Sequence, residues 1–447
     1  MLLSRKKLWA VTRVDTDFNY KPRLIDARLQ EYLKIFGAVT IDGPRCCGKT
    51  STGEHAANSK ILIADGKSES STVALAKIDA TLLWAGKQDA EFPLLIDEWQ
   101  EVPAIFDTVR FDVDKTQKKG RFILTGSAVT EETRHSGAGR FGSLKMSTLS
   151  LYEMGKSTGT VSLRAIFDDP SAVSGLAAPC SLEDLALILG AGGWPASLTL
   201  PADVDPASAS QRIAEEYLSK VCSSDLKKVG GFKRTPNPTL LRKVLHVLAE
   251  CDSSVVSITD LQNRLNEKGV TIARNTLSLY IDILKKLFLI SDIEGISFID
   301  QSPRKMLTSP KRRFVDPSLL LAALEKNPKE LKNDIKTFTM AFDNLCCHDM
   351  QVYAMANNAK LYHLKDGYGW TADSVLKLDD GRWAIFKHVL SSADVDDAAA
   401  KLVKIKKAFE NFETPISYCG VICGTGFPAA FMRPDAVVVL PITAIAP

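Results

Sequence analysis

The chain has 447 residues, a formal net charge of +3 and 45% hydrophobic residues. This length allows about three domains of roughly 150 residues, and so small a charge implies no partner by itself. No apolar run approaches the roughly 20 residues that a membrane helix needs, so we expect a cytoplasmic protein without a membrane partner. Nine cysteines, with adjacent pairs at Cys46–Cys47 and Cys346–Cys347, favour reduced thiols.

The first predicted elements surround a glycine-rich loop. Residues 37–41 form an apolar run typical of a buried strand, and residues 51–58 continue as a helix. Between them, Gly-x-x-x-x-Gly-Lys-Thr is the pattern of a phosphate-binding loop, in which backbone amides turn inward around phosphates. The alternative is a chance glycine turn. The predicted ATP-binding residues are Gly43, Pro44, Arg45, Cys46, Cys47, Gly48, Lys49, Thr50 and Ser51.

Two side chains of this loop have separate chemical tasks. Lys49 would bring positive charge to the phosphates, and Thr50 would offer its hydroxyl to Mg²⁺. The N-terminus of the following helix directs its dipole at the same anion. The predicted cofactors are therefore ATP and Mg²⁺.

A pair of acids follows the next apolar strand, within residues 92–100. Asp97 would lie at the end of the strand and help to hold Mg²⁺, and Glu98 would polarise the attacking water as a general base. A tandem acid of this kind suggests hydrolysis rather than nucleotide storage. The alternative is that both acids only cap the end of a strand.

A further strand is predicted over residues 120–127, and it ends in small hydroxyl residues. In a sheet of the additional-strand ATPase type, this strand places a polar side chain near the γ-phosphate, so Thr125 or Ser127 fits a sensor role. Another strand at residues 61–65 and a helix over residues 102–119 complete an alternation of strand and helix. The N-terminal part is therefore predicted to be a parallel α/β sheet covered on both faces.

Residues 133–141 form a glycine-rich loop that carries two arginines. A flexible loop of this kind would suit a guanidinium that reaches the γ-phosphate of a neighbouring subunit. Arg140 is the first candidate for such an arginine finger and Arg134 is the second, and this role implies a homo-oligomer. The alternative is a solvated basic loop.

The middle of the chain is predicted to be helical. A helix at residues 181–189 begins with a capping box, and Gly-Gly-Trp-Pro follows at residues 192–195. Further helices are expected at residues 207–223, 239–250, 258–268 and 273–287. The last two look like a helix-turn-helix, and residues 289–298 look like a β-wing.

This winged-helix region is more basic than the rest of the chain. From Asp225 to Arg313 it has 16 Lys and Arg against 9 Asp and Glu. Its basic clusters are Lys285–Lys286, Arg304–Lys305 and Lys311–Arg313, and the residues expected to face outward from the second helix are Arg274, Asn275, Ser278 and Lys285. These side chains could contact a nucleic-acid groove. A rigid lid or a platform for a protein partner is the alternative.

The segments GPRCCGKT, LLIDEWQ, RFILTGS and HSGAGRF, together with Met146–Glu153, resemble a family of predicted prokaryotic AAA-type ATPases. The resemblance runs over nearly the whole chain and implies three parts. These are an AAA-type P-loop ATPase domain at residues 1–180, a helical and winged-helix region at 181–325, and a small restriction-endonuclease-like α/β domain at 326–447. The implied fold class is α/β, with a parallel P-loop NTPase sheet in the first part.

The last part departs from the pattern of this family. Relatives with a nuclease-like signature carry an acid in a helix, an Asp ahead of a strand and Glu-x-Lys within a strand. Asp343 and Asp373 can stand for the first two, but Lys387 stands at the Glu position and Val389 at the Lys position. A lysine does not ligate a hard cation as a carboxylate does. We therefore predict a degenerate domain without nuclease activity, in which both acids pair with Lys387 or another base.

Two classes of function follow from these patterns. The first is a Mg²⁺-dependent ATPase that acts as a switch or motor on nucleic acid or on a protein partner. The second is a nucleotide-bound regulatory scaffold without significant turnover. The tandem acid at Asp97 and Glu98 favours the first. A nucleotide kinase is a weaker third, because no arginine-rich lid for a phosphoryl acceptor is apparent.

Overall fold

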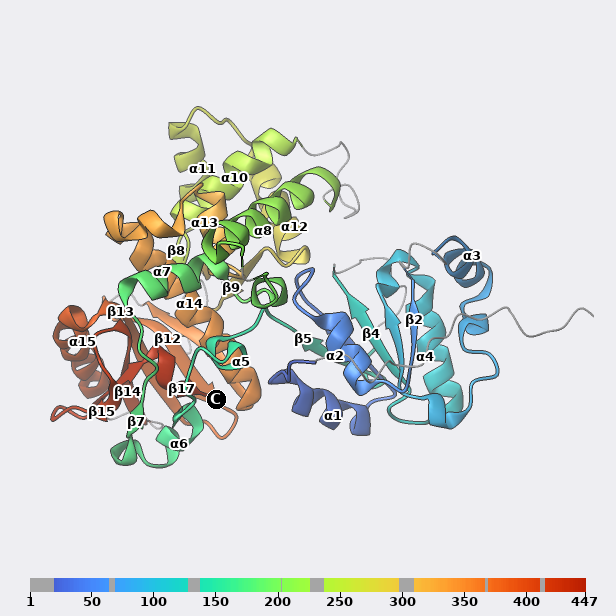
Figure 1. Cartoon of the computed structure of the whole chain (residues 1–447), viewed down its shortest axis with the longest axis horizontal. Coiled ribbons are helices and arrows are strands. Elements are labelled where there is room, and N and C mark those ends of the chain that lie inside the picture. Colours follow the sequence, from blue (N-terminus) through green and yellow to red (C-terminus); the bar gives the residue numbers. More distant parts are fainter. Residues whose placement is uncertain are drawn as a thin grey trace, which may run out of the picture. The chain divides into compact units, whose positions relative to one another are not determined.

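A computed structural model describes residues 20–63, 69–127, 137–201, 203–225, 237–296, 309–365, 369–410 and 415–447. The chain divides into two compact units, Met1–Ser147 and Thr148–Pro447 (Figure 1). This boundary precedes the expected one at residue 180, because short strands that follow Ser147 pair with the last strands of the second unit. Three candidate basic residues lie outside the described ranges: Arg134, Arg304 and Lys305.

The first unit is built on a parallel five-stranded sheet in the order β2-β3-β4-β1-β5. The strands are β1 (Ala38–Asp42), β2 (Ser59–Leu62), β3 (Leu94–Asp97), β4 (Phe122–Gly126) and β5 (Phe141–Lys145). β4 lies between β1, which leads into the glycine-rich loop, and β3, which ends in the predicted magnesium acid. The predicted parallel sheet is confirmed, and the carboxyl ends of these three strands meet at one edge.

Four helices accompany this sheet: α1 (Ile25–Ile35), α2 (Lys49–Ala56), α3 (Glu69–Asp79) and α4 (Ala104–Thr116). In β3, the successive residues Leu94, Leu95 and Ile96 are fully buried, although their side chains point alternately to opposite faces of the sheet. A continuous apolar strand of this kind is expected where a parallel sheet is covered on both sides. On α4, Ile105, Val109 and Val113 recur every four residues and pack into the same core as β3 and β4. This confirms the helix predicted within residues 102–119.

The second unit contains a helical region and a small sheet. Its helices are α5 (Leu151–Met154), α6 (Leu163–Asp168), α7 (Leu182–Ala191), α8 (Pro206–Lys220), α10 (Pro238–Glu250), α11 (Ile258–Glu267), α12 (Arg274–Lys286) and α13 (Pro317–Ala323). An antiparallel sheet in the order β8-β10-β9 combines β8 (Ser254–Val255), β9 (Ile290–Ile293) and β10 (Lys311–Phe314). The capping box predicted at Ser181 is present, since Ser181 and Asp184 bond reciprocally at the start of α7.

β10 holds one of the three basic clusters of the winged-helix region, Lys311–Arg313, and this cluster is buried. Lys311, Arg312 and Arg313 are at most 9% exposed. The Lys311 ammonium lies 2.8 Å from Asp343, and Arg312 lies 2.9 Å from Asp292. Buried charges persist only where opposite charges and hydrogen bonds compensate them. The run therefore belongs to the interior of the second unit and presents no charge to a partner.

The outward face predicted for α12 is confirmed in part. Arg274 and Asn275, in its first turn, are exposed. Ser278 and Lys285 are half-buried, and the Lys285 ammonium lies 2.5 Å from Asp292. Of the four residues predicted to face outward, only the two in the first turn of α12 are therefore exposed.

A seven-stranded mixed sheet forms the other half of the second unit. Its order is β11 (Ala359–Lys365), β12 (Thr371–Leu378), β13 (Trp383–Ser391), β14 (Tyr418–Thr425), β16 (Val437–Pro441), β15 (Ala429–Met432) and β7 (Gly175–Leu176). A separate pair joins β6 (Val161–Ser162) to β17 (Ile445–Ala446). A turn at Asp379–Gly381 connects β12 to β13, and Gly381 has a φ of 92°, which favours glycine.

Two helices pack against this sheet, α14 (Ile335–Ala356) and α15 (Val395–Ala408). Ile385 and Val389 of β13 share a core with the apolar face of α15. Because side chains alternate along a strand, His388 points to the other face, where its ring contacts Asp343 of α14. Among the described residues, no helix is long and apolar enough to cross a membrane.

Candidate nucleotide-binding site

The glycine-rich loop runs from the end of β1 to the start of α2. Gly48 caps α2 with a φ of 105°, a left-handed conformation that costs glycine little. A Cβ on Gly43 would lie 2.2 Å from the carbonyl oxygen of Met146, so only glycine fits there. The backbone path thus requires both glycines of the motif. It also places the loop at the amino end of a helix, where anions bind.

Lys49 is the first residue of α2 and is 5% exposed. Its ammonium donates to the carbonyl oxygens of Gly43 and Pro44, at 2.9 and 2.7 Å. Phosphate oxygens can replace these neutral acceptors, because hydrogen bonds between charged groups are the stronger ones. The lysine charge is therefore enclosed by the loop that would hold the phosphates.

Thr50 and Asp97 come together at the carboxyl edge of the sheet. The hydroxyl of Thr50 donates to both carboxylate oxygens of Asp97, at 2.9 and 3.1 Å. Burial raises the pKa of Asp97 above its usual value, and hydrogen bonds from Thr125 and Thr50 oppose that rise. A hydroxyl and a carboxylate are oxygen ligands of the kind that Mg²⁺ prefers. The two residues therefore fit the ion that the motif implies.

The end of β4 supports both acids at the end of β3. Thr125 pairs in register with Asp97, and its hydroxyl donates to that carboxylate. Two residues later, Ser127 donates to Glu98 at 3.0 Å. Glu98 has a left-handed backbone, with a φ of 55°, which ends β3. The structure thus brings together the two predicted acids and both predicted sensor residues.

Gln100 also holds Glu98, and the sequence analysis missed it. Its side-chain amide donates to the carboxylate of Glu98 and lies 3.3 Å from the hydroxyl of Ser127. The signal was the position of Gln100 in LLIDEWQ, two residues after the proposed base. Glu98 accordingly carries two hydrogen bonds from within the first unit.

Arg23, ahead of the first helix, braces the loop and was also missed. It is 8% exposed, and its guanidinium donates to the carbonyl oxygens of Cys47 and Ser147, at 2.8 and 2.9 Å. Nearby, the ring of Tyr20 stacks on His55 of α2, with centroids 4.2 Å apart. No local pattern marks these residues, because the partners of Arg23 are 24 and 124 residues away.

Asp42, the last residue of β1, stands beside the loop. Burial raises its pKa to about 6, and the positive charge of Lys49 opposes the rise, as Lys145 does more weakly. Its carboxyl is therefore half protonated near pH 6 rather than near pH 4. This gives the phosphate-binding edge a group that titrates close to neutrality.

Arg140 lies away from the glycine-rich loop of its own chain. Its carbonyl accepts from the N–H of Gly37, so it lies at the amino end of the sheet, whereas the loop follows the carboxyl end of β1. A five-residue strand separates the two, a length of about 15 Å at roughly 3.3 Å per residue. The guanidinium lies 2.7 Å from Asp114, and the side chain is 44% exposed. A role in the site of another subunit stays a prediction.

In the second unit, the acids of the nuclease-like signature pair with bases, as predicted. Lys387 lies 3.0 Å from Asp373. Asp343 lies 2.8 Å from Lys311 and 2.5 Å from His388. Burial lowers the pKa of His388, but the hydrogen bonds and charges of Asp343 and Cys347 together outweigh it, and the pKa rises to about 9. Despite its burial, Lys311 and His388 hold the pKa of Asp343 well below its usual range.

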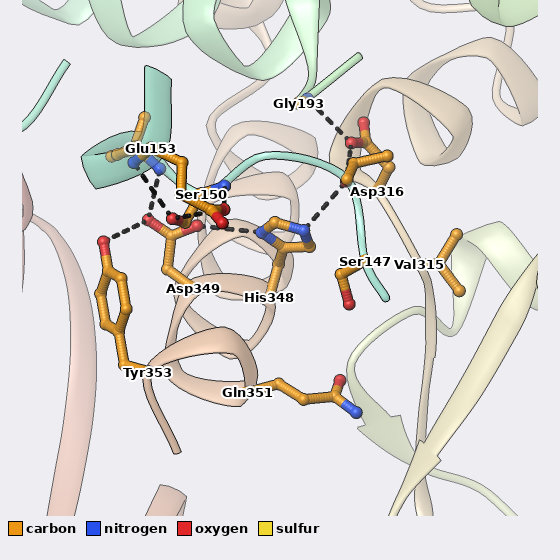
Figure 2. Close-up of polar contacts among 12 residues, drawn as sticks. Ser147, Ser150, Glu153, Gly193, Val315, Asp316, His348, Asp349, Gln351 and Tyr353 are labelled. Carbon is orange, nitrogen blue, oxygen red and sulfur yellow. Dashed lines mark hydrogen bonds and ion pairs between the residues drawn. The ribbon is translucent and has the colours of Figure 1, made fainter. Parts of the chain in front are cut away.

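A buried polar network fixes the segment that opens the second unit (Figure 2). The ring of His348 lies between Asp349 and the hydroxyl of Thr148, with both contacts at 2.9 Å. Thr148 donates to Asp316 at 2.7 Å, and Asp316 also accepts from the N–H of Gly193 at 2.9 Å. The four side chains are at most 2% exposed. Polar groups that satisfy one another in the interior specify one arrangement of the backbone around them.

The same region explains the Gly-Gly-Trp-Pro turn. The carbonyl of Gly193 accepts from the N–H of Leu149 at 2.7 Å, and a Cβ on Gly193 would lie 2.1 Å from the carbonyl oxygen of Leu149. One residue on, the indole of Trp194 donates to Ser318 at 2.9 Å. Two segments that the sequence singled out are therefore packing partners within the second unit.

Comparisons with known proteins assign two parts of the chain. Residues 36–155 match the model of a family described as an AAA domain. Residues 182–330 match a domain of unknown function, DUF8612. The first match covers the loop, both acids and the sensor strand. Over these residues the chain is therefore similar to an AAA domain.

Curated relatives and solved structures match up to about two thirds of the chain. Uncharacterized proteins of Mycobacterium tuberculosis and Mycobacterium bovis are each 26% identical over 317 residues, which is 68% of this chain and 61% of theirs. The match thus spans less than two thirds of the length of these relatives. A Walker-type ATPase of Pyrococcus abyssi has a TM-score of 0.42 at 14% identity, covering 68% of this chain and 96% of that one. PCH-2 of C. elegans has a TM-score of 0.21 at 13% identity, with coverages of 59% and 66%.

Proposed function

We propose that the chain binds ATP with Mg²⁺ at residues 43–51 and hydrolyses it. The observation that carries this proposal is the meeting of Thr50 with Asp97, with Glu98 held beside them by Ser127. Hydrolysis of a phosphoanhydride requires bound phosphates, an ion that neutralises their charge and a group that orients water. The carboxyl edge of this sheet offers a residue for each of these tasks.

Each residue has one task in this proposal. The amides of the loop and the ammonium of Lys49 bind the phosphates, and Thr50 and Asp97 hold Mg²⁺, which neutralises phosphate charge when bound. Glu98 accepts a proton from the attacking water as its oxygen approaches the γ-phosphate. Thr125 and Ser127 orient the two acids through their hydroxyls.

A nucleotide-bound scaffold without turnover is the second candidate, and one observation favours it. The carboxylate of Glu98 already accepts hydrogen bonds from Gln100 and Ser127. A base that keeps both bonds after ATP binds has less lone-pair capacity left for water. The two candidates therefore differ in the effect that they predict for replacing Glu98: ATP hydrolysis slows only if Glu98 acts as the base.

We expect Lys49→Ala to abolish ATP binding, because the loop loses its only ammonium. Glu98→Gln should bind ATP as the wild type does and hydrolyse it about a hundredfold more slowly, within the usual range for loss of a general base. Binding is measured by calorimetry with Mg²⁺ and turnover by phosphate release. The matched control is Glu101→Gln, an exposed acid three residues on, which should leave both unchanged. Equal turnover in Glu98→Gln and wild type would remove Glu98 as the base.

We further propose a winged helix within the second unit, as the part that meets a partner. The order α10, β8, α11, α12, β9, β10, with its three-stranded sheet, supports this assignment. The exposed first turn of α12, at Arg274 and Asn275, supports contact with nucleic acid. A protein partner is the alternative. The turnover assay, run with and without duplex or single-stranded DNA, decides between the two: stimulation that fades with salt supports nucleic acid.

We propose that the C-terminal part is a degenerate restriction-endonuclease-like domain without Mg²⁺-dependent cleavage. The mixed sheet with α14 packed on it supports the fold. The ion pair Asp373–Lys387 supports the loss of activity, because Lys387 stands where the signature needs a carboxylate and it pairs with one of the two remaining acids. A hard divalent cation needs carboxylates whose charge is still available.

A further inference from the structure

Three residues of different chemistry converge on the α14 face of the seven-stranded sheet. Asp343 and Cys347 are four residues apart on α14 and so lie one above the other on one side of the helix. His388 reaches the same place from β13. One ligand atom from each of the three lies within 4.8 Å of the other two. Cys347 is fully buried and His388 is 9% exposed.

Hydrogen bonds to neighbouring groups orient two of these three side chains, those of His388 and Asp343. Nε2 of His388 lies 2.9 Å from the hydroxyl of Ser374, so its Nδ1 faces Asp343. Oδ2 of Asp343 lies 2.8 Å from Lys311, and its Oδ1 faces His388. Both side chains thus direct one specified atom inward. A hydrogen bond at the second ring nitrogen is the usual support of a metal-binding histidine.

We propose that Asp343, Cys347 and His388 bind a Zn²⁺ ion. A set of one oxygen, one sulfur and one nitrogen suits a borderline-soft cation and not Mg²⁺. With ligands at about 2.0–2.3 Å from the ion, the ligand atoms of a tetrahedral site lie roughly 3.3–3.8 Å apart. Each ligand atom therefore moves by about 1 Å or less to reach that geometry. Three protein ligands leave the fourth position to water.

The charges around the site are compatible with this ion. The ammonium of Lys311 bonds to Oδ2 of Asp343 and to the carbonyl oxygen of Asp373, whereas Oδ1 of Asp343 bonds to His388. The ammonium of Lys387 is engaged by the side chain of Asp373. On binding, Zn²⁺ takes the place of the hydrogen between Nδ1 and Oδ1 and of the thiol proton, and both protons leave to solvent. Asp343 keeps its side chain 19% exposed, which gives the ion a path to the site.

The test uses the full chain freed of metal and then exposed to Zn²⁺ or to Co²⁺, with excess removed by gel filtration. Elemental analysis should find one Zn²⁺ per chain. The Co²⁺ form should show the strong d–d bands of four-coordination and a thiolate-to-cobalt absorption. That absorption separates this site from the oxygen ligands Thr50 and Asp97, which give none. Wild-type protein without bound metal, or Co²⁺ bound without the thiolate absorption, overturns the proposal.

Variants assign the ligands. Cys347→Ser should lose the thiolate absorption and bind Zn²⁺ about a hundredfold more weakly, whereas Ser374→Ala should keep the absorption and lose about tenfold in affinity, as outer-shell partners do. Cys346→Ser is the matched control, because Cys346 is the adjacent residue on α14, is 1% exposed and belongs to no such cluster among the described residues. It should bind as the wild type does. Loss of the absorption in Cys346→Ser but not in Cys347→Ser would overturn the assignment. Circular dichroism checks that each variant is folded.

Discussion

Asp42 ties the proposed nucleotide site to pH. Its pKa is raised to about 6 by burial, with Lys49 and Lys145 as the charged groups that oppose the rise. Between about pH 4 and pH 6 the folded chain binds this proton and the unfolded chain does not, so the contribution of Asp42 to stability falls as pH rises through that range. Above pH 6 Asp42 is mostly ionised, and its negative charge lies beside the loop that we propose to bind phosphates.

We therefore expect Asp42 to weaken nucleotide binding as it ionises. With Mg²⁺-ADP, the Kd of the wild type divided by the Kd of Asp42→Asn should rise severalfold from pH 5 to pH 7.5, because only the wild type gains a negative charge there. Comparing the two chains cancels the titration of the ligand itself. Calorimetry at four or five pH values measures this ratio. A ratio that stays constant with pH would show that Asp42 does not act on the phosphates.

At the residue scale, the spacing of the loop and the tandem acid were enough to predict which side chains meet. Lys49, Thr50 and Asp97 do so because a phosphate loop and the next-but-one parallel strand always end at the same edge. Gln100 and Arg23 were not predictable in the same way. Their contacts depend on the left-handed turn at Glu98 and on a carbonyl 124 residues distant, and neither leaves a pattern in the sequence.

At the scale of the element, β10 shows why a count of charges fails to locate a surface. Its three basic residues bond to partners in two other elements, at Asp343 and Gln351 of α14 and at Asp292 of β9. Net charge over a window contains no information on such partners. The elements themselves were largely predictable, because apolar periodicity and capping residues are local. The two-residue strands β6, β7 and β8 were not, since they exist only through pairing.

β13 carries the argument against nuclease activity at this same scale. The carboxylate of Asp373 accepts from the N–H of His388 at 2.9 Å and lies 3.0 Å from the ammonium of Lys387, which stands where the signature needs a carboxylate. We expect duplex and single-stranded DNA to stay intact with the full chain and Mg²⁺ or Mn²⁺. Gel electrophoresis after long incubation checks this. Metal-dependent cutting that disappears in Asp373→Ala would contradict the degenerate domain.

For the whole molecule, the position of Arg140 predicts assembly. An arginine finger at this position would have to serve the site of a second copy, because it lies a strand length from the loop of its own chain. Loss of an arginine finger costs about a thousandfold or more in rate. Mixing Arg140→Ala with Glu98→Gln chains should therefore restore part of the ATPase activity that each lacks alone, because one kind of interface then joins an intact finger to an intact base.

Arg110→Ala is the matched control for this experiment. Arg110 lies on α4 and pairs with the same Asp114, at 3.5 Å, but not at the edge of β5. It should retain activity alone. Light scattering with ATP measures the mass of the assembly. A monomeric mass, together with no recovery of ATPase activity in the mixture, would support the alternative that Arg140 belongs to a solvated basic loop.

The second unit closes on itself through its two ends, and this has a consequence for its synthesis. β6 pairs with β17 and β7 pairs with β15, whereas every strand of the first unit's sheet lies between residues 38 and 145. On the ribosome, the first unit has all its strands early. The second, Thr148–Pro447, waits about 15–60 s at roughly 5–20 residues per second before its last strand emerges. Throughout that interval the β6 and β7 segments lack their partner strands. We therefore expect the newly synthesised second unit to depend on chaperones more than the first unit does.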